Sequence, residues 1–167
     1  ITSNQDFVFA TAGLHIVAVS RTSGELMWQF ALEGSADEVI IHEGHVYATS
    51  SVYDIEHNDF IDSAVWCFTF DGNNLWTKHI DERPWTIFSD DNTVIIGLGR
   101  PKMGIATINQ EGEINHQQLA SNSPVTFGKL IGSKPVFGHA NGDVSSIDGK
   151  ITSIEGESIE EALTDNQ

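Results

Sequence analysis

Apolar and polar residues alternate in short runs along most of the chain, and polar turns separate one run from the next. Such runs include DEVIIHEG and HVYATSS in the first half, and PWTIFSDD, NTVIIGLG, PVTFGKLIG and KPVFGHA further on. Alternation of period two places successive side chains on opposite faces of a strand, and no long helical periodicity appears before the C-terminus. The pattern therefore predicts an all-β protein of short antiparallel strands.

Four hairpins recur around the turn glycines Gly24, Gly72, Gly112 and Gly149, which are 48, 40 and 37 residues apart. In each hairpin a strand-like run leads into a polar turn that contains the glycine, and a second run follows. Glycine supplies the positive φ angle that such tight turns need. Another pair of runs precedes each of the last three hairpins, which gives four strands in about 40 residues. Repeats of this length and composition are typical of β-propeller blades.

We place about four blades in residues 1–156, at approximately 1–34, 35–81, 82–120 and 121–156, and an acidic tail or short helix at 157–167. No strand-like run precedes Asp6, so we expect three strands in the first unit and fifteen in the chain. An incomplete first unit would leave open blade faces, which favour self-association or pairing with flanking blades of a larger protein. A small closed ring of four blades is the third arrangement.

One hairpin carries extra residues, VYDIEHNDFIDS, from Val52 to Ser63. Insertions in repeat proteins usually form loops on one face, so we expect an exposed loop that folding does not need. Oxygen-rich loops can bind Ca²⁺, but the spacing differs from that of an EF-hand and lacks its turn glycine. We therefore predict no metal site. The weak candidates, if a metal binds, are Asp54, Glu56, His57, Asp59 and Asp62.

The charge is strongly acidic, with 24 Asp and Glu against 8 Lys and Arg and a formal net charge of −16. Such a surface repels phosphate backbones and anionic lipid, which argues against nucleic-acid binding. The apolar runs are far shorter than the roughly 20 residues that span a bilayer, so we expect no direct membrane insertion. A solvated surface, a salty habitat and a basic partner are the three interpretations of the charge.

Candidate catalytic chemistry is sparse in the sequence. Cys67 is the one cysteine, so no disulfide forms within the chain, and its alternating run AVWCFTF predicts a small core residue. The stretch GLGRPKMG lacks the order of a phosphate-binding loop, and no HExxH or Gly-x-Ser-x-Gly pattern occurs. We predict no catalytic or cofactor-binding residue.

The segment AVSRTSGELMW resembles the PQQ-like repeat of the quinoprotein-dehydrogenase-like family, and CFTFDGNNLW is similar to a form of it that is one residue shorter. Ser20 and Ser23 depart from the usual Asp and Thr, and the last two units lack the tryptophan. In the family this tryptophan lies between neighbouring blades and locks them together. The resemblance therefore implies structural blade-locking roles for Gly24, Trp28, Gly72 and Trp76, each Trp following its Gly by four positions.

Propellers of this family have seven or eight blades, so the resemblance implies that the chain is a fragment of a larger PQQ-repeat protein. It implies a non-catalytic scaffold or protein-interaction domain, with a periplasmic or extracellular location favoured. The alternatives are part of a quinone-dependent dehydrogenase, with PQQ and calcium as cofactors, or a ligand-sensing propeller domain. A lone Cys67 cannot form the adjacent-cysteine disulfide of many such dehydrogenases, and no set of ligands matches theirs. We therefore expect a protein partner or self-association rather than an enzyme, and no cofactor.

Overall fold

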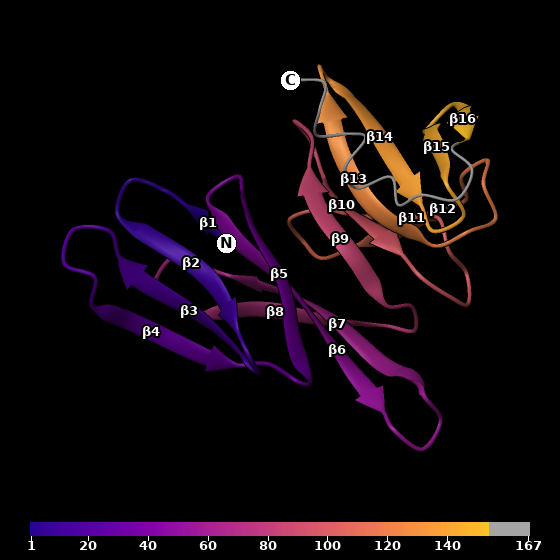
Figure 1. Ribbon diagram of the computed structural model, residues 1–167. Helices are drawn as coiled ribbons and strands as arrows, with labels where there is room; N and C mark the ends of the chain where they lie inside the picture. The colour runs from indigo at the N-terminus through magenta and orange to yellow at the C-terminus, as the bar shows by residue number, and fades with distance from the viewer. Residues whose placement is uncertain (154–167) are drawn as a thin grey trace. The chain divides into compact units, whose positions relative to one another are not determined.

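The computed structural model describes residues 1–153, where the strands form four antiparallel four-stranded sheets (Figure 1). Each sheet is a meander in which strands that follow one another in the chain are hydrogen-bonded neighbours. The first sheet comprises β1 (Thr2–Ser3), β2 (Phe7–Ala12), β3 (His15–Ser20) and β4 (Leu26–Ala31), and the second β5 (Ser35–His42), β6 (His45–Asp54), β7 (Asp59–Phe68) and β8 (Asn74–Ile80). The third comprises β9 (Pro84–Ser89), β10 (Val94–Leu98), β11 (Ile105–Ile108) and β12 (Ile114–Gln117), and the fourth β13 (Val125–Ile131), β14 (Lys134–His139), β15 (Asp143–Ser146) and β16 (Gly149–Ser153). The predicted all-β fold of blade-like units is confirmed. No helix with the length and apolar composition of a membrane span occurs within residues 1–153.

The chain divides into two compact units, one from Ile1 to Arg83 and one that begins at Pro84. In the first unit, β5 of the second sheet contacts β1, β2 and β3 of the first. The core between these two sheets includes the fully buried side chains of Phe9, Ile16, Val46 and Phe68. Burying an apolar side chain of this size contributes about 1.5–3 kcal/mol, so this shared core holds the two sheets together.

The second unit repeats this arrangement with its own pair of sheets. Strand β13 contacts β9 and β10, as β5 contacts the strands of the first sheet. The core of this unit brings together Ile95, Ile105, Val125 and Phe137, all of which are buried. Each unit thus pairs two neighbouring blades around one apolar interface.

The two motif hairpins share a structural detail that the sequence alone did not show. Ala18 pairs with Trp28 and Val19 with Leu26, which leaves Met27 as the extra residue of a β-bulge. The second hairpin has the same register shift between the pairs Cys67–Trp76 and Phe68–Asn74. A bulge re-aims the side chains beside it and increases the local twist. Both tryptophans therefore occupy equivalent positions, directly after a bulge in the second strand of the hairpin. The turn glycines also match, since both have positive φ, +74° at Gly24 and +87° at Gly72.

The three-strand prediction for the first unit is wrong. Strand β1 (Thr2–Ser3) pairs with β2, Thr2 opposite Phe9 and Ser3 opposite Val8, so this sheet has four strands like the others. The Asn4 side chain turns the chain between them, because its Oδ1 accepts the N–H groups of Asp6 at 2.9 Å and Phe7 at 2.8 Å. The prediction that the first blade lacks a strand is therefore wrong, whereas association through the faces of the end blades stays a prediction. The predicted tail or helix at 157–167 lies outside the described residues.

The loop prediction for Val52–Ser63 is also wrong. Strands β6 and β7 continue through the segment, with Tyr53 opposite Phe60 and Asp54 opposite Asp59, and only residues 55–58 form the turn. Ser63 is buried, at 3% exposure, and belongs to the sheet interior. The extra residues therefore lengthen the β6–β7 hairpin beyond the other strands of its sheet.

Candidate functional site

Trp28 links the first sheet to the second. Its indole Nε1–H donates a hydrogen bond to the carbonyl oxygen of Phe70 at 2.8 Å, and its ring lies 5.9 Å from the ring of Phe9 and 6.1 Å from that of Phe68. Gly72 lies directly against the indole, since a β-carbon built there would come within 2.7 Å of a ring atom. These contacts are those that a blade-locking residue would make, and the energetic role stays a prediction.

Trp76 occupies the equivalent place on β8, opposite Cys67. Its ring meets that of Tyr47 edge-on, with 5.9 Å between the ring centres, inside its own sheet. Its blade-locking role therefore also stays a prediction. Cys67 is buried as expected, and burial raises the pKa of its thiol to about 11.

The tip of the β6–β7 hairpin is held by hydrogen bonds within the turn. The Asp54 carboxylate accepts the backbone N–H of Glu56 at 2.8 Å and pairs with the ring Nδ1 of His57. The hydrogen bond to His57, followed by that from the Glu56 backbone, holds the pKa of Asp54 below its usual range. The Tyr53 hydroxyl donates to Asn58 Oδ1 at 2.5 Å. The tip is thus an organised turn with its own hydrogen-bond network.

Exposed apolar side chains gather on this same hairpin. Ile55, at the turn, is 86% exposed, Ile61 is 58% exposed and Tyr53 is 48% exposed. Ile61 has no partner in the ladder between Asp62 and Phe60, so it is a bulge residue whose side chain is displaced outward. Acidic side chains alternate with these three in the sequence: Asp54, Glu56, Asp59 and Asp62. The hairpin therefore exposes three apolar side chains, and acidic residues adjoin them in the sequence.

The base of the hairpin is tied to neighbouring segments. The Arg83 guanidinium lies over the ring of Phe60, 3.8 Å from its centre, a cation–π contact. The Ser51 hydroxyl donates to the Asp37 carboxylate at 2.5 Å. Burial raises the pKa of Asp37, although the hydrogen bond from Ser51 and the charge of Arg83 act in the opposite direction. These contacts orient the hairpin relative to β5.

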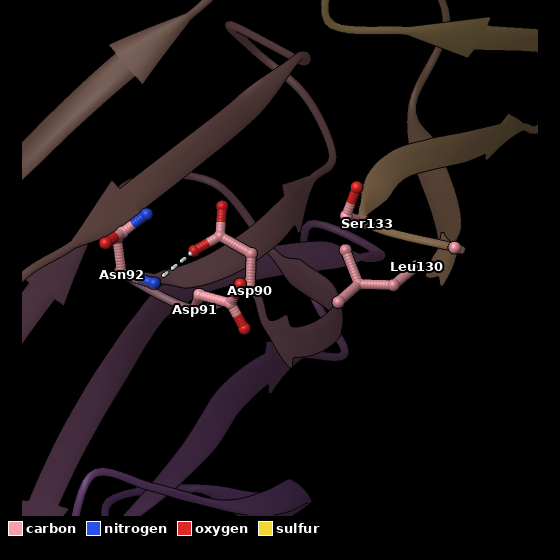
Figure 2. A pocket seen from close by; sticks show the side chains of 6 residues that line it. Asp90, Asp91, Asn92, Leu130 and Ser133 are labelled. Carbon is pink, nitrogen blue, oxygen red and sulfur yellow. Dashed lines mark hydrogen bonds between the residues drawn. The ribbon is translucent and has the colours of Figure 1, made fainter.

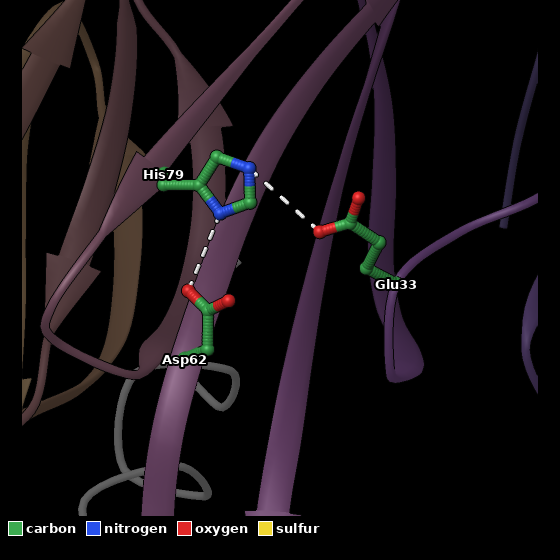
Figure 3. A group of neighbouring side chains, drawn as sticks. All are labelled: Glu33, Asp62 and His79. Carbon is green, nitrogen blue, oxygen red and sulfur yellow. Dashed lines mark hydrogen bonds and ion pairs between the residues drawn. The ribbon is translucent and has the colours of Figure 1, made fainter.

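The five weak metal candidates do not form one group. Asp54 and His57 pair at the tip, and the Asp59 carboxylate accepts the backbone N–H of Phe60 at 2.8 Å. Asp62 instead lies with Glu33 and His79, and the ligand atoms of these three lie within 4.8 Å of one another. Figure 3 shows the His79 ring between the two carboxylates, with Nδ1 3.3 Å from Asp62 and Nε2 3.7 Å from Glu33.

Glu33 and His79 are neighbours of Asp62 that were not predicted from the sequence. The β7–β8 register pairs Ala64 with His79, and Asp62 lies two residues from Ala64 on the same face. Diagonal neighbours of this kind lie within reach of each other's side chains. A register counted from the Gly72 turn would have placed His79 opposite Ser63, on the other face from Asp62, because the bulge after Cys67 shifts the pairing by one residue. Glu33 comes from the connection between sheets and has no local signal.

A small hollow of about 160 Å³ lies between the β9–β10 and β13–β14 turns (Figure 2). Asp90, which lines it, accepts the backbone N–H groups of Asn92 and Thr93 at 2.8 Å and so serves its own turn. The hollow is smaller than the roughly 300–1,000 Å³ of ordinary ligand pockets. Its polar groups shape a turn rather than converge on a ligand.

One serine–histidine pair lies in the interior of the fourth sheet. The Ser145 hydroxyl and His139 Nε2 are 2.7 Å apart, and His139 Nδ1 lies 3.0 Å from the Ser123 carbonyl oxygen. A carbonyl only accepts, so Nδ1 carries the proton and Nε2 accepts from Ser145. Ser145 is fully buried, so no substrate reaches it, and the pair links strands instead.

No known protein-family profile and no curated protein sequence matches the chain. Solved structures do resemble it. A protein of unknown function from Bacteroides caccae has a TM-score of 0.63 at 14% identity, over 90% of this chain and 58% of its own. The AfRom2 CNH domain has a TM-score of 0.62 at 12% identity, over 92% of this chain and 56% of its own. BBS1N, solved in complex with ARL6DN, has a TM-score of 0.55 at 15% identity, over 92% of this chain and 52% of its own.

The chain spans slightly more than half the length of these structures. At such low identities the likeness shows the fold alone, which is that of a β-propeller, with sheets that resemble its blades.

Proposed function

We propose that the chain is a non-catalytic β-propeller domain that binds a protein partner through the tip of the β6–β7 hairpin, and that it is part of a larger PQQ-repeat protein. The observation that carries this proposal is Ile55, an isoleucine that is 86% exposed at the end of a hydrogen-bonded hairpin. Scattered exposed apolar residues are ordinary on protein surfaces. Three on one projecting element, Tyr53, Ile55 and Ile61, are typical of an interaction site.

The organised turn supports binding because an ordered tip loses little conformational freedom when a partner docks. Charge defines the kind of partner. Carboxylates lie beside the apolar side chains, and the chain has a formal net charge of −16, so a complementary surface has an apolar pocket with Lys or Arg at its rim. BBS1N, whose fold is similar, was solved in complex with another protein, ARL6DN, which is a precedent for protein binding by such a fold.

Membership of a larger PQQ-repeat protein is supported by the two motif hairpins. Both have a positive-φ glycine in the turn, a bulge, and a tryptophan directly after the bulge. Repeated local geometry of this kind is what tandem blades of one family share.

The test compares proteins captured by the wild-type domain with those captured by the double variant Ile55→Ser/Ile61→Ser. Leu14→Ser is the matched control, because Leu14 is 55% exposed in a turn of the first sheet. We expect a basic protein that wild type and L14S retain and the double variant loses. With that protein purified, the dissociation constant should rise at least about 10-fold for the double variant. Equal binding of every captured protein to all three forms contradicts the proposal. A bound-quinone absorbance band after mixing with PQQ and Ca²⁺ would instead favour the dehydrogenase alternative.

A further inference from the structure

Glu33, Asp62 and His79 converge from three different segments of the first unit. Glu33 lies in the connection from β4 to β5, Asp62 on β7 and His79 on β8. One oxygen from each carboxylate and one imidazole nitrogen lie within 4.8 Å of one another (Figure 3). Among residues 1–149, whose side chains are described, no other three His, Cys, Asp or Glu side chains come together in this way.

The fold fixes the backbone of each of the three residues. The last two pairs of the β7–β8 ladder, Ser63 with Ile80 and Ala64 with His79, lie directly after Asp62 and set its place relative to His79. The connection that carries Glu33 is clamped on both flanks. The Leu32 N–H donates to the Leu14 carbonyl at 2.8 Å, and Gly34, at φ +79°, lies so close to the Ser51 carbonyl that a β-carbon would approach it to 2.3 Å. The three ligands are therefore brought together before any ion binds.

The charge of the cluster favours a cation. Glu33 and Asp62 bring two carboxylates to the same place, and their ion-pair partner in the described part of the chain is His79. Two explanations fit this geometry. A protonated imidazole can donate to both carboxylates, or a neutral imidazole can join them in binding a metal ion.

We propose that Glu33, Asp62 and His79 bind one divalent transition-metal ion of the zinc class. An imidazole nitrogen with two carboxylate oxygens suits Zn²⁺ better than Ca²⁺ or Mg²⁺, which take oxygen ligands. Metal–ligand distances of about 2.0–2.2 Å place tetrahedral ligands ~3.3 Å apart. The side chains of Glu33 and His79 are more than half exposed, so they are free to rotate and contract the cluster to this spacing.

A bound ion has a structural consequence. It joins the connection between the first two sheets to β7 and β8, so it ties this connection to the base of the β6–β7 hairpin. An ion that binds the folded chain and not the unfolded chain raises the midpoint of thermal unfolding as its concentration increases. This inference does not depend on the proposed protein partner.

The test is calorimetric titration of ZnCl₂ into the full chain, with thermal unfolding followed in parallel. We expect one saturable site in the micromolar range that is at least 10-fold weaker in His79→Ala and weaker in Glu33→Gln and Asp62→Asn. His57→Ala is the matched control, because His57 also pairs with a carboxylate, Asp54, but without a third ligand within reach in the described part of the chain. Its affinity for Zn²⁺ should equal that of wild type. Equal midpoints of all forms in EDTA show that the variants fold.

Three results overturn the proposal. The first is absence of saturable Zn²⁺ binding by the wild type. The second is loss of affinity in His57→Ala as large as in His79→Ala. The third is a higher affinity for Ca²⁺ than for Zn²⁺ at this site, which would show that the site does not prefer an ion of the zinc class.

Discussion

The indole ring of Trp28 lies against Gly72, so closely that a β-carbon on Gly72 would come within 2.7 Å of it. The two residues belong to different sheets, and each occupies a motif position of its own hairpin. The glycine of the second hairpin thus serves two purposes, since it adopts φ +87° in its turn and leaves room for the tryptophan of the first.

Trp28→Ala should lower the free energy of unfolding by about 3 kcal/mol or more, as truncation of large aromatic side chains does. Trp28→Phe keeps much of the ring packing but removes the donor to the Phe70 carbonyl, so it should cost about 1 kcal/mol for that hydrogen bond in addition to the smaller ring. Chemical denaturation measures both. A midpoint for Trp28→Ala close to that of wild type would contradict a locking role.

Gly72→Ala tests the contact itself. In the wild-type background it should cost the strain of a left-handed conformation, about 1–2 kcal/mol, plus a steric cost against the indole. In the Trp28→Ala background the steric part should vanish while the conformational part remains. A double-mutant cycle isolates this difference. Full additivity of the two substitutions would show that a β-carbon at position 72 does not contact the indole of Trp28.

Shortening the hairpin should separate folding from binding. Replacement of residues 54–59 by Asn-Gly keeps Tyr53 opposite Phe60 and leaves the Arg83 contact with Phe60 in place. Asn-Gly is a favoured two-residue hairpin turn, so we expect the free energy of unfolding to change by less than about 1 kcal/mol. Binding of the protein partner should be lost. Unfolding of the shortened chain in the absence of denaturant would show that the tip belongs to the folding core.

Asp37 should make stability depend on pH in a defined direction. Burial raises its pKa in the folded chain from an ordinary value near 3.8, so the folded state favours the protonated form. The ionised carboxylate therefore costs stability at neutral pH, and this cost disappears as the pH falls through the folded-state pKa. The free energy of unfolding of Asp37→Asn, relative to that of wild type, should therefore be higher at pH 7 than near pH 3.5.

Urea denaturation of both forms across this range measures the difference, and Asp59→Asn, at an exposed position, is the control. A difference between Asp37→Asn and wild type that does not change with pH would contradict the effect of burial.

Cys67 should be inert in the folded chain. With its pKa raised to about 11 from 9.0, the thiolate fraction at pH 8 is about 100-fold lower than that of an unperturbed thiol, and burial restricts access further. A thiol-specific reagent at pH 8 should therefore react at least about 100-fold faster in denaturant than in buffer. Equal rates would place the side chain at the surface.

The sequence predicted those parts of the fold that depend on local pattern. Alternation predicted the strands, and the equal offsets of Trp28 from Gly24 and of Trp76 from Gly72 predicted equivalent hairpins. Strand β1 was missed because two polar residues, Thr2 and Ser3, show no alternation, and the Asn4 turn holds them in place.

The hairpin extension was missed because its acidic composition resembles that of a loop. The segment is nevertheless a pair of strands, because the pairs from Val52–Asp62 to Asp54–Asp59 extend the same β6–β7 ladder that starts in the buried part of the sheet. The Glu33, Asp62 and His79 cluster depends on tertiary structure, since Glu33 approaches the other two only after β5 has packed beside the first sheet. Local pattern has no information on such a contact.

Site-specific photo-crosslinking tests most directly whether the hairpin tip binds a protein. Benzoylphenylalanine at position 55 should form one discrete adduct with a basic protein on irradiation in the source cells, whereas the same group at position 14, which is also exposed, should not. The adduct should disappear when Ile61, another exposed apolar residue of the hairpin, is changed to Ser. Absence of any discrete adduct from position 55, or the same adduct from both positions, would contradict the account.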